Sequence, residues 1–124
     1  MIERIADMPA GTVGFRAAGR VDRDDLAGVL LPALEEALRG DATLRMLHEL
    51  GPDLEEVDPR RLWAEVRDAN PLGMEHLGRI ERTAVAAGEG WGRRAATRYG
   101  WMLPGEFKLF GATESDAARR WLAR

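Results

Sequence analysis

The chain has 124 residues, no cysteine and a formal net charge of −3 at pH 7. This length fits one domain with one hydrophobic core, so we expect a single domain over residues 1–124. The missing cysteines exclude disulfides, a thiol nucleophile, iron–sulfur clusters and thiolate zinc sites. The charge argues against nucleic acid as a partner, because a general polyanion binder needs a concentrated basic face.

No segment has the pattern of a membrane span or a secretion signal. A span needs about 18 or more mostly apolar residues, and no stretch of the sequence approaches this. The N-terminal segment carries Glu3 and Asp7 and lacks the apolar run of a signal peptide. We therefore expect a cytoplasmic protein, which can still lie peripherally on a membrane surface.

The N-terminal segment predicts a pair of strands. Residues 13–21 alternate between apolar and polar or small side chains, which is typical of a half-buried strand. Residues 2–5 form a shorter strand before it. Pro9, Ala10 and Gly11 supply the turn, so we expect the two strands to pair antiparallel.

A long helix and a third strand follow. Asp22 fits an N-cap, and apolar residues at helical spacing continue to Gly40, where the helix ends. Pro32 lies inside this helix and presses on the carbonyl of Gly28. We expect a bend there and a helix that survives it. Residues 44–50 form the third strand, which a β-α-β crossover joins to the second.

An acidic loop over residues 52–59 leads into the next helix. Asp58 is the expected N-cap and Pro59 the first helical residue. The apolar face of this helix is formed by Leu62, Trp63 and Val66. Residues 70–73 read Asn-Pro-Leu-Gly and interrupt it, and residues 74–77 form a second short helical piece.

The remaining pattern alternates strands and helices. We expect strands at residues 83–87 and 107–110 and helices at residues 91–99 and 115–122, the last one capped by Thr113 or Ser115. The order is β-β-α-β-α-β-α-β-α. It predicts an α/β fold with a single mixed β-sheet of four or five strands and helices packed mainly on one side.

The residues that could carry catalysis are few. Ser115 is the only serine, and because it lies at the start of a predicted helix we expect it to be an N-cap. His48 and His76 have no spacing that implies a metal site, so both are expected to be structural or surface histidines. The glycine-rich turn at residues 88–92 could bind an anion at the following helix N-terminus, but a flexible turn is the favoured interpretation. We expect no cofactor, no metal and no enzymatic activity.

Tryptophans gather in the second half of the chain. Three of the four lie at Trp63, Trp91 and Trp101, and arginines are interleaved with apolar residues over 91–103. Such a segment can rim an apolar pocket or lie at a membrane interface. The alternative, slightly favoured by the residues themselves, is that the rings pack on the sheet with arginine stems at their edges.

Several short sequence motifs, taken together with the order of the predicted elements, point to a known family. They are Gly14-Phe15-Arg16-Ala17 with Gly19, Leu31-Pro32-Ala33-Leu34, Arg82-Thr83-Ala84-Val85, Trp91, Pro104-Gly105-Glu106 leading to Phe110, and Ala118-Arg119-Arg120-Trp121-Leu122. This set resembles the SpoIIAA-like family of bacterial proteins, whose fold belongs with STAS domains and CRAL-TRIO lipid-binding domains. The resemblance covers nearly the whole chain at scaffold positions, so it implies a fold more strongly than an activity.

The resemblance implies second and third helices that open over an apolar cavity for lipid or another hydrophobic ligand. On this sequence the cavity maps to Leu62, Trp63, Val66, Leu77, Trp91, Trp101 and Met102. His76 joins this set, because a residue beside a helix break can face a cleft.

Three functions follow from these observations. The first is a non-catalytic binding module for a hydrophobic or lipid-like ligand with transient membrane contact. The second is a STAS-type protein interaction domain that uses Glu55, Glu56 and the following helix, without a phosphorylatable serine, since residues 51–58 contain no serine or threonine. The third is an enzyme that uses His76 and a carboxylate. A homodimer is compatible with each of them.

Overall fold

The strands form one mixed sheet. The computed structural model describes residues 1–40, 42–69, 78–103 and 105–124, and in this part of the chain the strands follow each other across the sheet in chain order. They are β1 (Ile2–Ile5), β2 (Thr12–Ala17), β3 (Leu44–Leu50), β4 (Ile80–Ala87) and β5 (Glu106–Phe110). β1 pairs antiparallel with β2, and all other neighbours are parallel.

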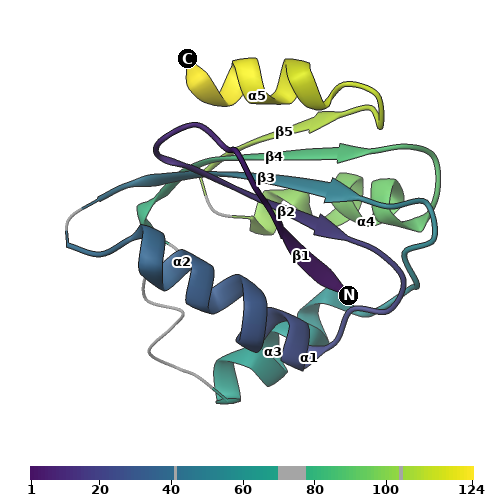
Figure 1. Ribbon diagram of the computed structural model, residues 1–124. Coiled ribbons are helices and arrows are strands. Elements are labelled where there is room, and N and C mark those ends of the chain that lie inside the picture. Colours follow the sequence, from purple (N-terminus) through teal and green to yellow (C-terminus); the bar gives the residue numbers. More distant parts are fainter. Residues whose placement is uncertain (41, 70–77, 104) are drawn as a thin grey trace.

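The helices cover both faces of this sheet (Figure 1). They are α1 (Arg23–Asp25), η1 (Leu26–Leu30), α2 (Leu31–Ala37), α3 (Pro59–Ala69), α4 (Trp91–Tyr99), η3 (Gly100–Met102) and α5 (Ser115–Ala123). Crossovers between parallel strands are right-handed, and here they all advance in one direction. The crossover helices α2, α3 and α4 therefore lie on one face, and α5 lies on the other. The predicted fold class is confirmed.

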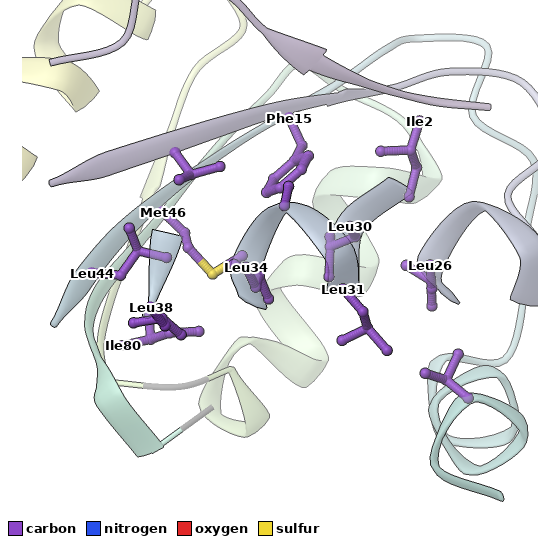
Figure 2. Packing of buried hydrophobic residues seen from close by; sticks show 13 residues of the cluster. Ile2, Phe15, Leu26, Leu30, Leu31, Leu34, Leu38, Leu44, Met46 and Ile80 are labelled. Carbon is purple, nitrogen blue, oxygen red and sulfur yellow. The ribbon is translucent and has the colours of Figure 1, made fainter. Parts of the chain in front are cut away.

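The main core lies between the sheet and the helix that begins at α1. Phe15 of β2 and Met46 of β3 pack against the apolar stripe of η1 and α2, where Leu30 and Leu34 are buried. Figure 2 shows these side chains between the strands and the helix. Residues two apart on a strand share a face, which is why Val13 joins Phe15 in this cluster.

The opposite face has a smaller core under α5. Its largest members are Trp121 and Leu122 of α5, Phe110 of β5 and Leu47 of β3. The rings of Phe110 and Trp121 have centroids 6.1 Å apart. Because Leu47 lies between Met46 and His48 on β3, one strand supplies side chains to the cores on both faces.

The first long helix, formed by α1, η1 and α2, accommodates Pro32 through a change in its backbone hydrogen bonding. As predicted, Asp22 is the N-cap of this helix. Its side chain and that of Asp25 form a reciprocal capping box. The segment η1 is π-helical, with the Leu31 N–H bonded to the Leu26 carbonyl. Pro32 has no N–H to give to the carbonyl of Gly28, and the wider turn directly before it accommodates this loss.

Several predicted ends of elements, and one predicted cap, are wrong. The second strand ends at Ala17 and not at residue 21, because Gly19 has a φ of 59° and leaves the extended conformation. The fourth strand begins at Ile80 and not at residue 83. The last helix has Glu114 at its N-cap, with no side-chain cap bond, so neither Thr113 nor Ser115 caps it. The Glu114 carboxylate instead accepts from the Gly111 N–H at 2.7 Å.

Candidate functional site

An open groove of about 660 Å³ lies between the start of α3 and the exposed side of α4. We call it the α3–α4 groove. It is lined by Glu56, Val57, Asp58, Pro59, Arg60, Trp91, Arg94, Ala95, Arg98 and Tyr99. The apolar and aromatic members are partly buried and form a floor, whereas the charged members are exposed and form a rim.

The spacing of residues on α4 produces the floor. Trp91, Ala95 and Tyr99 recur every four residues and therefore line one side of the helix. Gly92 and Ala96 lie on another side and are buried against the sheet. A Cβ at position 92 would lie 3.2 Å from Leu50 Cδ1, so the missing side chain lets α4 approach β3 closely.

The other wall is the beginning of α3. The Arg60 N–H donates to Asp58 Oδ1 at 3.0 Å, which confirms Asp58 as the N-cap with Pro59 as the first helical residue. The loop before it is tied to the end of β2, since the Glu55 N–H donates to the Gly19 carbonyl at 2.8 Å. The wall is therefore held by a side-chain cap at the start of α3 and by one backbone hydrogen bond from the loop before it.

The rim is formed by charged side chains from both walls of the groove, the α3 side and α4. The Arg60 guanidinium lies 5.7 Å from the centroid of the Tyr99 ring, and that of Arg98 lies 5.5 Å from the same centroid. Arg94 Nη2 is 3.9 Å from Glu56 Oε1. The rim thus holds three guanidinium groups near an aromatic floor.

The structure separates most of the predicted ligand residues. Trp91 lines the groove, whereas Val66 is fully buried and Leu62 and Trp63 are partly buried against the main core. Trp101 lies on η3 with 74% of its surface exposed. Met102 also belongs to η3. His76 and Leu77 lie outside the described residues.

Sequence reasoning did not consider Arg60, and it left Tyr99 and Arg98 out of the mapped ligand set although both lie in the 91–103 segment that was expected to rim an apolar pocket. The stripe at Trp91, Ala95 and Tyr99 could have indicated the aromatic floor. Arg60 gives no such signal, because its place beside Tyr99 depends on how α3 and α4 pack on the sheet.

His48 shows no feature of a catalytic or metal site. Its ring stacks on Phe15, with centroids 5.9 Å apart, and burial lowers its pKa from 6.5 to about 4. Among the described residues, no group of three or more His, Asp and Glu side chains could hold a metal ion. In that same part of the chain, no helix is both long and apolar enough to cross a bilayer.

Comparison with known proteins identifies the relatives of this chain. The family model described as SpoIIAA-like matches residues 12–123. A solved structure from Shewanella loihica PV-4, described as an uncharacterized protein of the DUF3478 family with a SpoIIAA-like fold, is 29% identical and superposes with a TM-score of 0.65, covering 98% of this chain and 92% of that chain. A comparison with curated proteins found no match. The agreement of family model, strand order and superposition means that the chain belongs to the SpoIIAA-like family.

Proposed function

We propose that this protein is a non-catalytic module that binds a hydrophobic or lipid-like ligand in the α3–α4 groove. Its SpoIIAA-like, STAS-type fold is typical of modules without catalytic activity. The observation that carries the proposal is the groove floor, where Trp91 and Tyr99 are only partly buried. Small-molecule sites are concave and about 300–1,000 Å³ in volume; the groove of about 660 Å³ falls in this range, and half of its lining residues are apolar or aromatic.

Trp101 is the candidate for transient contact with a membrane. An indole has an apolar body and a polar N–H, so exposed tryptophans favour the bilayer interface. Trp101 is 74% exposed and follows the groove residue Tyr99 by two positions. Contact through Trp101 would therefore hold the groove near the lipid.

The two parts of this proposal respond to different substitutions. Protein made in bacteria is examined by native mass spectrometry for a bound lipid, and its binding to liposomes is measured by flotation. We expect Trp91→Ala to lose the bound lipid, and Trp101→Ala to retain the lipid but float less. Thermal unfolding of both variants checks that the fold persists. If no lipid co-purifies and vesicles leave the tryptophan fluorescence unchanged, the proposal is wrong.

The acidic loop favours a second candidate, a STAS-type protein interaction domain. Asp53, Glu55 and Glu56 are exposed, and the backbone bond from Glu55 to Gly19 holds the loop in place. A fixed acidic surface suits a basic partner. A pull-down whose partner is lost on Asp53→Lys with Glu55→Lys, two exposed residues outside the groove lining, while lipid binding persists, would favour this candidate over the first.

A further inference from the structure

We infer that the α3–α4 groove selects amphiphiles with an anionic head, such as a phosphate, which Arg60 and Arg98 hold above the aromatic floor. This inference rests on the proposed function, because it assumes that the groove takes the apolar part of the ligand. It adds the chemical class of the head, which an apolar floor alone cannot specify.

Arg60 and Arg98 have guanidinium groups that no carboxylate neutralises in the part of the chain that the structure describes. Both are exposed and both lie within 6 Å of the Tyr99 ring centroid. Nearby arginines differ in this respect, since Arg94 pairs with Glu56 and Arg61 pairs with Glu65. The two free guanidinium groups come from opposite walls of the groove.

The acidic residues of the rim are already engaged. Asp58 accepts the Arg60 backbone N–H as the cap of α3, and Glu56 lies 3.9 Å from Arg94. A guanidinium offers five N–H donors in a planar fork that matches phosphate or carboxylate oxygens. The rim carries three arginines and two carboxylates, a local excess of positive charge in a chain whose formal net charge is −3.

The position of Tyr99 places the head at one end of the groove. Arg60 and Arg98 flank Tyr99 near the C-terminal end of α4, whereas Trp91 is the first residue of that helix. Trp91 and Tyr99 are separated by roughly 12 Å along the helix axis, with Ala95 between them. An alkyl chain of intermediate length can lie along this stripe while its head contacts the arginines.

Decyl phosphate and decanol test the inference, because they share a chain and differ in the head. Calorimetric titration below the micelle concentration should give a dissociation constant at least about tenfold lower for decyl phosphate. The double variant Arg60→Gln with Arg98→Gln should lose this preference and retain decanol binding. The control Arg61→Gln alters a neighbouring arginine that does not line the groove, so it should keep the preference.

The outcomes separate this inference from the proposed function. Equal binding of the two probes, or a preference that survives the double variant, overturns the inference and leaves the groove as an apolar site. Failure of both probes to bind overturns both proposals. Inorganic phosphate distinguishes an amphiphile from a free anion: if it binds as tightly as decyl phosphate, the alkyl chain contributes nothing and the inference is wrong.

Discussion

His48 is an ionisable residue that serves as part of the apolar face of β3. It alternates with Leu47 and so shares the face of Met46 and Leu50. Its ring stacks on Phe15 at an interplanar angle of 23°, and burial lowers its pKa to about 4. The imidazole is therefore neutral at pH 7 and stacks as an aromatic ring on Phe15.

Protonation of His48 should make the fold sensitive to acid. The unfolded chain binds this proton with a pKa of 6.5, whereas the folded protein resists it down to about 4. This contribution to the free energy of unfolding is fully present above pH 6.5 and falls as the pH drops towards 4. Its loss levels off below pH 4, at about 3 kcal/mol by the usual conversion.

The variant His48→Phe isolates this effect, because it keeps an aromatic ring and removes the ionisation. Urea unfolding of both proteins is measured at several pH values between 7 and 4. All other titrating groups are common to the two proteins, so the free energy of unfolding of the wild-type protein minus that of the variant should fall as the pH drops and His48 takes up its proton. A difference that stays constant across this range would contradict the expected pKa.

At the scale of elements, strongly periodic segments were predictable, and for two of them the ends were predictable as well. Residues 44–50 and 91–99 were predicted with the boundaries that the structure shows, because their patterns are regular and their ends carry turn residues. The π-helical segment η1 was not predicted, since the sequence indicates only that Pro32 must be accommodated. The positive φ of Gly19 depends likewise on contacts made after folding.

The candidate site was less predictable for a similar reason. Trp63 and Trp91 were grouped because both lie in the second and third predicted helices. The rotation of α3 on the sheet turns Leu62 and Trp63 into the main core and leaves Arg60 towards Tyr99. Neither the rotation of a helix nor its neighbour across a groove is encoded in local spacing, so the floor was found only in part.

The attachment of α5 depends on arginines of the sheet. Arg82 donates to the Trp121 carbonyl at 2.8 Å, its guanidinium lies 5.3 Å from the Trp121 ring centroid, and it pairs with Glu106 at 3.3 Å. Arg45 donates to the Leu122 carbonyl. The last carbonyls of a helix lack partners within the helix and favour cations, so these side chains complete the C-terminal end of α5.

Arg82→Ala should loosen α5 more than the rest of the protein. We expect a loss of about 2 kcal/mol in the free energy of unfolding, typical of charged hydrogen bonds, and faster hydrogen exchange at the α5 amides. Arg120→Ala is the control: it removes an exposed arginine of α5 itself, and it should change stability by less than about 0.5 kcal/mol. Equal effects of the two variants would show that the Arg82 contacts do not hold the helix.

At the scale of the whole molecule, the sheet couples two cores. Leu47 is fully buried under α5, whereas Met46, the residue before it on β3, and Phe15 of β2 belong to the core on the opposite face. The strands cannot separate from one helix layer without disturbing the other, because the same backbone carries both sets of side chains. This arrangement supports the prediction of a single domain over residues 1–124.

A single domain should unfold in one cooperative transition. Trp63 reports on the main core and Trp121 on the core under α5, so versions that retain one of these tryptophans, with the others replaced by phenylalanine, follow each face separately. We expect the two urea transitions to coincide. Leu47→Ala, which removes a buried side chain at a cost of about 2–5 kcal/mol, should shift both transitions to the same lower midpoint. If only the Trp121 transition moves, the layer under α5 unfolds independently and the single-domain prediction is wrong.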